Sequence, residues 1–396
     1  MFKKFIQSNT SKNSSLKNVY YLIHQYGPIS RATLLKITKM KKTTLARMID
    51  ELQKYNYIIE SGLGETKIGR PPTLYQANAK CGYLIGIHIS RTESRIILTD
   101  LLFNTIELES FTMTSLHTPA IVLPKFSKFI ETVIDKYQIT TDELLGISIG
   151  AIGPLNIDEG IIINPDPFPA PGWVNVPIAN YFSEKFPVQC TLEYGVNMAV
   201  FGEHYRKFKE YNNILYCMSG HELGGGVIKD GRLANNNYVG DVSQYGHMII
   251  EANGKVCTCG KKGCLVTYTS PQSILNNIME KYKYEDWEEN NLDRLKIDHV
   301  LDFLKQGDDA IDRLVKESAY YLGIGIANLI TVLNSEVIIL NGPLINEYPN
   351  YYEETVKSIQ QHINPYHKDE VHFSKASLKD NSAAIGATIY LFYSLF

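Results

Sequence analysis

Two stretches of the chain have the same predicted local structure: a strand, a tight turn and a second strand. Residues 83–100 read YLIGIHISRTESRIILTD, and residues 214–233 read ILYCMSGHELGGGVIKDGRL, with a glycine-rich turn. Each stretch is followed by alternating strand-like and helix-like segments, an order typical of α/β folds. The sequence therefore predicts an α/β body of two similar halves, each beginning with a β-hairpin.

A body duplicated in this way is the layout of the actin-like and sugar-kinase (ribonuclease H-like) architecture, in which a nucleotide lies between the lobes and both hairpin turns surround its phosphates. A glycine-rich hairpin alone is weak evidence for such a site, because glycine at a turn usually serves only backbone geometry. The 396 residues also exceed one ordinary domain. We expect an N-terminal domain over residues 1–76, a linker over 77–81, a first lobe over 82–205 and a second lobe over 206–396.

The N-terminal region predicts a small helical unit. Apolar residues spaced i, i+3, i+4 and i+7 indicate an amphipathic helix over residues 15–26. Ser30 offers an N-cap for a short second helix that reaches Thr38, and a third helix is expected over residues 42–55. Three helices with a short middle turn are typical of a helix-turn-helix unit, whose third helix reads the major groove of DNA.

A predicted hairpin follows these helices. Residues 57–60 and 73–75 have the character of two short strands around a glycine-rich tip, as in the wing of a winged helix. Lys67 and Arg70 lie on that tip, and the Gly-Arg-Pro sequence around Arg70 is similar to a short motif that inserts an arginine into an A·T-rich minor groove. The alternative is a helical protein-interaction module that carries an additional hairpin.

Charge also separates the N-terminal region from the rest of the chain. Residues 1–75 hold 13 Lys and Arg against 4 Asp and Glu, whereas the remainder holds 26 against 38. A basic front on an acidic body favours a polyanion-binding module, although a solvated basic surface would give the same balance. The residues expected to contact double-stranded DNA are Lys42 at phosphates, Thr43, Thr44 and Arg47 at base edges, and Lys67 and Arg70 from the wing.

Three of the six cysteines lie in one short segment that follows a histidine in the sequence. Their spacing is His247-x9-Cys257-x-Cys259-x4-Cys264. One imidazole and three thiolates match a closed tetrahedral zinc site, which leaves no open position for a catalytic water. Such density in a cytosolic protein favours metal over disulfides, so a structural zinc ion is the expected cofactor. Chance clustering of a buried histidine and free thiols is the alternative.

The winged-helix pattern, the Gly-Arg-Pro-Pro wing, the sequence GHM…CTCGKKGCL and the two hairpins together resemble the ROK family (repressors, open reading frames, kinases). The resemblance is closer to the repressor branch of the family and covers essentially the whole chain. The zinc signature is its most specific element. The resemblance implies a winged helix-turn-helix domain fused to a two-lobed body of the sugar-kinase type.

Comparison with the family pattern implies that kinase chemistry is lost. The family's sugar kinases carry Asp-x-Gly-Gly-Thr where this chain has His-Ile-Ser-Arg-Thr, so His88 replaces a magnesium-binding aspartate. Glu222 places a carboxylate in the second phosphate loop, and residues 341–343 replace a glycine run below the adenosine. The family's Glu-Asn-Asp-x-Asn aligns with Glu-Tyr-Gly-Val-Asn, which puts Gly195 at the catalytic base. General-base catalysis contributes roughly 10²–10⁴-fold, so we expect no useful kinase activity.

Sugar binding is a separate question from catalysis. The resemblance places Asn164, Pro165, Tyr194, Gln244 and His247 at an effector site. His247 would bind zinc through one ring nitrogen and reach the ligand with the other. Tyr194, Gln244 and Val266 replace polar residues that normally contact the sugar. The site is therefore expected to hold a less hydroxylated or differently shaped ligand, or none.

The expected function is sequence-specific transcriptional regulation, with repression of carbohydrate-utilisation genes modulated by a sugar-type effector. We expect a cytoplasmic protein, because the sequence shows neither a signal peptide nor a membrane span. We also expect a homodimer or higher even oligomer, because one winged helix reads only a short half-site. An apolar helix over residues 318–334 fits either a dimer interface or a core. The alternatives are an active ROK sugar kinase with an accessory DNA-binding domain, a DNA binder without a sugar effector, and a zinc-stabilised scaffold that binds a protein.

Overall fold

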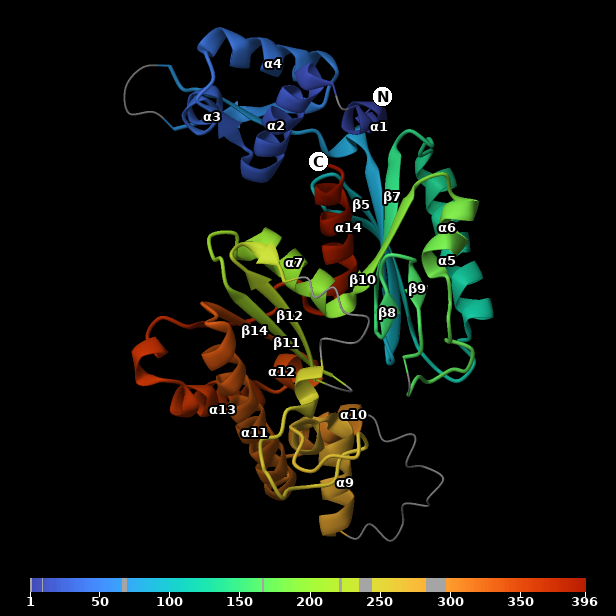
Figure 1. Ribbon diagram of the computed structural model, residues 1–396, viewed down its shortest axis with the longest axis vertical. Helices are drawn as coiled ribbons and strands as arrows, with labels where there is room; N and C mark the ends of the chain where they lie inside the picture. Colours follow the sequence, from blue (N-terminus) through green and yellow to red (C-terminus); the bar gives the residue numbers. More distant parts are fainter. Residues whose placement is uncertain are drawn as a thin grey trace.

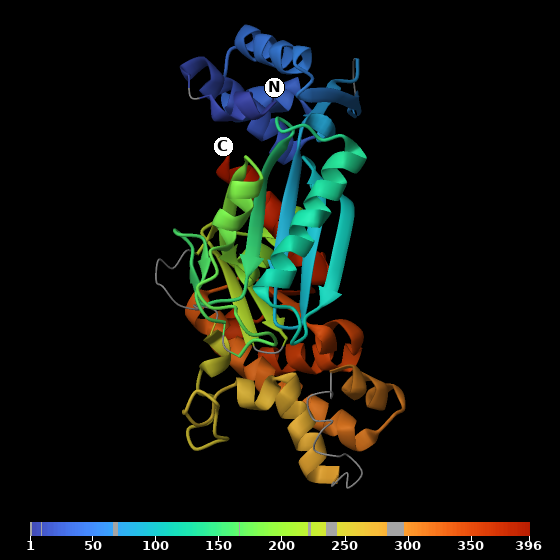
Figure 2. The same ribbon diagram turned by 90° about the vertical axis from the view of Figure 1, so that its right-hand side faces the viewer.

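Figure 1 shows the computed structural model of the chain, which describes residues 2–8, 10–65, 70–165, 167–220, 223–234, 244–282 and 297–396. A small N-terminal unit lies at one end of an elongated molecule, followed by a first α/β lobe and a second one. Two views at right angles agree on this order (Figure 2). Within the described residues, no helix is both long enough and apolar enough to cross a membrane.

The N-terminal unit combines helices with a three-stranded antiparallel sheet of order β1-β3-β2. Its elements are α1 (Phe2–Gln7), α2 (Ser11–Tyr26), β1 (Ile29–Ser30), α3 (Arg31–Thr38), α4 (Lys42–Lys54), β2 (Ile58–Leu63) and β3 (Thr73–Ala77). The Ser30 hydroxyl caps α3 by accepting a hydrogen bond from the Thr33 amide at 3.1 Å. The three predicted helices and two predicted strands are all present, whereas α1 and β1 had no signal in the sequence.

Each lobe is built on a five-stranded sheet. The first lobe contains β4 (Tyr83–Ile89), β5 (Glu93–Asp100), β6 (Thr105–Thr112), α5 (Pro119–Tyr137), β7 (Leu144–Ala151), β8 (Leu155–Asn156), β9 (Ile161–Ile162), α6 (Ile178–Lys185), β10 (Gln189–Tyr194) and α7 (Gly195–Lys207). The second lobe contains β11 (Ile214–Ser219), β12 (Leu223–Lys229), β13 (Arg232–Leu233), η2 (Gln244–His247), α8 (Val266–Thr269), α9 (Pro271–Tyr282), α10 (Ile297–Lys305), α11 (Asp309–Leu333), β14 (Val337–Asn341), α12 (Pro343–Glu347), α13 (Pro349–His362) and β15 (His372–Lys375). The chain then returns to the first sheet with α14 (Ser382–Ser394).

The two large sheets have equivalent topology, which confirms the predicted duplication. Their strand orders are β10-β7-β4-β5-β6 and β13-β12-β11-β14-β15. In each lobe the opening hairpin is antiparallel, and its first strand pairs in parallel with the next crossover strand, β4 with β7 and β11 with β14. The carboxyl ends of these parallel strands are where open α/β sheets place ligand sites.

Two helices join the lobes by packing against each other. α14 covers β4 and β7 on the face of the first sheet opposite α5 and α6, and α7 packs on β11 and β12 of the second lobe (Figure 1). The two helices approach closely at Gly202 and Gly386, where a β-carbon added to Gly202 would lie 2.9 Å from the Gly386 α-carbon. Glycine at both positions therefore permits the contact.

A continuous apolar core links the N-terminal unit to the body. It combines Tyr20 and Ile23 of α2 with Phe103, Leu145 and Phe392 of the body. In the second lobe, α11 buries its apolar face against α13, and its residues between 318 and 334 are mostly core. Of the two alternatives for that segment, the structure supports core packing, with Tyr320 and Val332 as exposed exceptions.

Candidate functional site

The main candidate site is a cleft of about 260 Å³ between the lobes. Its walls come from the ends of the strands and from the starts of the two helices that join the lobes. The lining includes His88, Arg91, Gly153, Tyr194, Gly195, Met218, Gly220, Gly246, His247, Val266, Asn341, Lys379 and Ser382. Both predicted hairpins, the β10–α7 junction and the zinc-loop side therefore meet at one cavity.

Glu193 organises the junction between β10 and α7. It is buried, and its Oε1 accepts hydrogen bonds from the Tyr194 amide at 2.8 Å and from Asn197 Nδ2 at 3.0 Å. Burial raises the pKa of the Glu193 carboxyl above its usual value, whereas these two hydrogen bonds lower it. Glu193 thus holds the first turn of α7 against the end of the strand.

Tyr194 is a buried part of the cleft wall. Its hydroxyl accepts a hydrogen bond from the Leu155 amide at 3.4 Å, and its ring fills the space in which a side chain at Gly153 would otherwise lie. The side chain therefore packs as well as lines the cavity. This packing explains why residue 153 is glycine.

Gly195 lies directly against His88, which stands at the end of β4. A β-carbon at Gly195 would lie 2.9 Å from His88 Nε2 and 3.1 Å from its Cδ2. Burial, with a smaller contribution from the Arg95 guanidinium, lowers the pKa of His88 to about 4. The imidazole is therefore neutral near pH 7. In the sequence, residues 88 and 195 are two separate differences from the sugar-kinase pattern. The structure brings them into contact.

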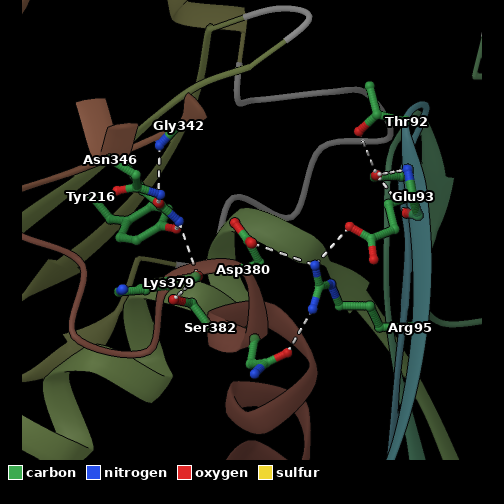
Figure 3. A network of polar contacts seen from close by, with 12 residues as sticks. Thr92, Glu93, Arg95, Tyr216, Gly342, Asn346, Lys379, Asp380 and Ser382 are labelled. Carbon is green, nitrogen blue, oxygen red and sulfur yellow. Dashed lines mark hydrogen bonds and ion pairs between the residues drawn. The ribbon is translucent and has the colours of Figure 1, made fainter. Parts of the chain in front are cut away.

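A polar network connects the lobes beside the cleft (Figure 3). Arg95 of β5 donates to Glu93 Oε2 at 2.6 Å and to Asn381 Oδ1 at 2.9 Å, and it lies 3.5 Å from Asp380 Oδ2. Arg95 is mostly buried, with 14% of its side chain exposed. Since Asp380 and Asn381 immediately precede α14, this arginine ties the first hairpin to the second lobe. Sequence reasoning missed Arg95, because its partners lie at the other end of the chain.

The second half of that network fixes the loop before α14. Asn341 Nδ2 donates to the Tyr216 hydroxyl at 2.7 Å and to the Lys379 carbonyl at 3.1 Å, while its Oδ1 accepts from the Gly342 amide at 2.9 Å. Ser382 donates to the Lys379 carbonyl as well, at 2.7 Å. The polar side chains of this wall are thus engaged with one another (Figure 3).

The predicted zinc ligands form one cluster. The candidate ligand atoms of His247, Cys257, Cys259 and Cys264 all lie within 4.8 Å of one another. Cys257 Sγ is 3.5 Å from His247 Nδ1, and Cys259 Sγ is 3.6 Å from Cys264 Sγ. Three sulfur donors and one imidazole fit a tetrahedral zinc ion, whereas hard cations such as magnesium prefer oxygen. The cluster could therefore hold zinc.

The loop that carries these cysteines needs its glycines. Gly260 and Gly263 have φ of 84° and 75°, a region that other residues rarely adopt. A side chain at Gly263 would also overlap the backbone of Glu251. His247 reaches the cluster with Nδ1 and also lines the cleft, so the metal site and the cavity share one side chain.

The residues predicted to bind an effector do not all lie at the cleft. Asn164 is exposed and Pro165 buried in the loop after β9, and neither lines the cavity. Gln244 begins the short helix η2, which ends at His247. Of the predicted set, Tyr194 and His247 line the cleft. Val266, at the start of α8, also lies in its wall.

The N-terminal unit presents the predicted DNA-contacting residues on α4. Lys42, Thr43 and Arg47 are exposed, Thr44 is half-buried, and Leu45 and Ile49 on the opposite face are in the core. Arg70 is exposed where the hairpin tip rejoins the described chain. Lys67 and Glu222 lie outside the described residues.

A histidine anchors the N-terminal unit to the body. His24 of α2 is buried, with Nε2 2.5 Å from the Leu101 carbonyl oxygen and Nδ1 3.2 Å from the hydroxyls of both Tyr205 and Tyr393. Its ring stacks on Phe392 with centroids 4.1 Å apart. Tyr205 lies near the end of α7 and Tyr393 near the end of α14, so the helices that start at the cleft both finish at His24.

Comparison with known sequences shows a family match over most of the chain. The ROK family model matches residues 84–392. The xylose repressor of Bacillus spizizenii is 28% identical over 360 residues, covering 91% of this chain and 90% of the relative. The N-acetylglucosamine repressor of Escherichia coli O6:H1 is 24% identical over 327 residues, covering 82% and 79%.

Comparison with solved structures gives the same fold. A ROK family transcriptional regulator, a homologue of the Escherichia coli MLC protein, superimposes with a TM-score of 0.77 at 22% identity, covering 97% of this chain and 96% of the regulator. A ROK hexokinase from Thermus thermophilus gives 0.64 at 20% identity, covering 79% of this chain and 99% of the kinase.

Proposed function

This chain belongs to the ROK family, and we propose that it is a DNA-binding transcriptional repressor whose inter-lobe cleft binds a sugar-type effector. One observation carries the proposal: the chain matches repressors over about nine-tenths of both lengths, so the match must extend into the N-terminal unit. The ROK hexokinase covers less of the chain. A role in carbohydrate-responsive regulation follows from the names of those relatives, the xylose and N-acetylglucosamine repressors.

The proposed DNA-binding domain spans residues 1–76 and is joined by residues 77–81 to lobes that span 82–205 and 206–396. It would act as a winged helix, with α4 in the major groove and the β2–β3 hairpin as the wing. The exposure of Thr43 and Arg47 opposite the buried face of α4 supports this orientation. The full contact set proposed is Lys42, Thr43, Thr44, Arg47, Lys67 and Arg70.

One such unit reads a short half-site, so useful specificity requires a second copy related by a two-fold axis. We therefore propose a homodimer or higher even oligomer that binds an inverted repeat. Selection from a random duplex library tests both points, because enrichment of an inverted repeat is expected. Enrichment of no sequence would contradict sequence-specific binding.

Zinc is proposed as a structural cofactor held by His247, Cys257, Cys259 and Cys264. All four coordination positions would come from the protein, so the ion would brace the loop rather than activate water. Because His247 also lines the cleft, the ion would fix the ring of a residue that faces the effector. Metal content of the purified protein tests the assignment.

The proposed mechanism couples the cleft to the DNA-binding unit through α7 and α14. A ligand that draws the lobes together would shift the starts of these helices, and their ends hold His24 through Tyr205 and Tyr393. Displacement of the two helices together would then reorient α2 and the rest of the N-terminal unit. DNA affinity that does not change when a bound sugar is present, at constant salt, would refute this mechanism.

An active sugar kinase is the second candidate, and one observation favours it. Gly195 cannot act as a base, but the neutral imidazole of His88 lies against it and could accept a proton. A coupled ATP-consumption assay across pentoses, hexoses and N-acetylated sugars separates the candidates. We expect no turnover. Turnover that disappears in His88→Ala would establish the kinase and overturn our assignment of a non-catalytic cleft.

A further inference from the structure

Most polar side chains that line the cleft already have hydrogen-bond partners within the protein. Ser90 donates to the Glu93 carbonyl at 2.7 Å, Arg91 Nε donates to the Pro167 carbonyl at 2.6 Å, and Ser382 donates to the Lys379 carbonyl at 2.7 Å. The hydroxyls of Tyr194 and Tyr216 and the amide of Asn341 are also paired. This wall is therefore mostly closed to new hydrogen bonds.

His88 is an exception to this pattern. It lines the cavity, yet within the part of the chain that the structure describes neither ring nitrogen has a hydrogen-bond partner. A neutral imidazole carries one donor and one acceptor. The His88 side chain is half-buried and faces the cleft, so a ligand that displaces water from the ring must replace its hydrogen bonds. A ligand in the cleft would supply the missing partner.

The position of the ring is set by Gly195. The imidazole occupies the space beside the Gly195 α-carbon, and any β-carbon there would come within 2.9 Å of Nε2. The same strand end is rigid, because His88 pairs with Arg95 on one side of β4 and with Gly150 on the other. The large side chain of His88 thus fits beside Gly195 because glycine has no side chain.

We propose that His88 is a ligand-binding residue of the cleft, that it hydrogen-bonds a hydroxyl group of an uncharged polyhydroxylated ligand, and that Gly195 makes room for its ring. The proposal rests on the cleft being the effector site. A hydroxyl suits a neutral imidazole because it can accept from one ring position or donate to the other. A phosphate oxygen only accepts, and His88 offers it no charge at neutral pH.

Isothermal titration of the full-length protein with D-xylose and with N-acetyl-D-glucosamine tests the proposal. The variants are His88→Ala, Gly195→Ala and the double variant, with His372→Ala as a matched control, because His372 is exposed on β15, outside the cleft. Thermal unfolding and zinc content of each variant establish that it is folded.

We expect His88→Ala to raise the dissociation constant about 10-fold, the size expected for one lost hydrogen bond in a shielded site. Gly195→Ala should raise it by at least as much, because the added methyl group displaces the ring. The double variant should bind no more weakly than His88→Ala, since the methyl group then has no ring to displace. His372→Ala should bind like the wild type.

Two outcomes overturn the inference in different ways. If the wild type binds either sugar and His88→Ala binds it within twofold, His88 is not a ligand contact, although the proposed sensing function stands. If the wild type binds neither sugar, both the sensing function and the inference fail. Should His88→Ala not fold, Gly195→Ala alone decides, because binding at the wild-type affinity would show that the ring position is irrelevant.

Discussion

The buried His24 makes a strong and specific prediction about stability and pH. Burial lowers the pKa of His24 to about 4, with nearby Lys209 contributing in the same direction and the hydrogen bond to the Leu101 carbonyl opposing it. An unfolded chain would titrate this histidine near its usual 6.5. Between these two values the unfolded state binds more protons, so the free energy of unfolding falls as the pH falls from 6.5 to 4.

The size of this effect follows from the shift. A lowering from 6.5 to about 4 corresponds to about 3 kcal/mol of stability that is present above pH 6.5 and lost by pH 4. The tautomer is fixed by the neighbours: the Leu101 carbonyl can only accept, so Nε2 carries the proton and Nδ1 accepts from the hydroxyl of Tyr205 or Tyr393. A second proton on Nδ1 would face these hydroxyls and the Phe392 ring rather than a carboxylate.

The assay is urea unfolding of the wild type and of His24→Gln at several pH values between 7.5 and 4, the range over which about 3 kcal/mol should be lost. The glutamine retains a donor for the Leu101 carbonyl but does not titrate. The variant should be less stable at pH 7.5, and its stability should fall less on acidification. Acidification also releases metal and protonates His88, whose pKa is also about 4. Both effects are the same in the two proteins, so they cancel in the difference between the two unfolding free energies. Parallel curves for the two proteins would refute the reasoning.

Three further predictions test other parts of the structure. Cys259→Ser should release zinc and lower the melting temperature, because a structural metal contributes to the folding free energy, whereas Cys190→Ser should keep its zinc; unchanged metal content in Cys259→Ser would contradict the site. Arg70→Ala should weaken DNA binding most at A·T-rich flanks in a competition gel shift, and an equal loss on all sequences would exclude minor-groove insertion. Gly386→Ala should cost roughly 1–3 kcal/mol in urea unfolding, because its methyl group would overlap the Met198 carbonyl on α7, and unchanged stability would show that the helices can separate freely.

The sequence predicts best those features that depend on residues near one another along the chain. The hairpins, the helices of the N-terminal unit and the cluster of His247 with three cysteines are set by local spacing, and the structure has each of them. Helix α1 gave no signal, because Phe2 and Phe5 are held by aromatic contacts with Tyr20 and Tyr57 rather than by helical periodicity.

Features that depend on distant residues could not be predicted in this way. The contact between His88 and Gly195 requires knowing that the ends of β4 and β10 face one cavity. Arg95 reads as an ordinary polar residue on a strand until α14 brings Asp380 and Asn381 beside it. That the His88 ring occupies the space left by the missing side chain of Gly195 can be seen only in the folded structure.

The position of α14 explains why a cleft between lobes could control a unit that lies at the far end of the molecule. The start of α14 is held by Arg95 from the first lobe and by Asn341 from the second, so relative motion of the lobes acts on it directly. Its middle contacts α7 through paired glycines, where no side chains are available to absorb a displacement by changing rotamer. Its end packs Phe392 on His24. A ligand that closes the cleft would therefore move a rigid pair of helices rather than a flexible linker, and the N-terminal unit would move with them.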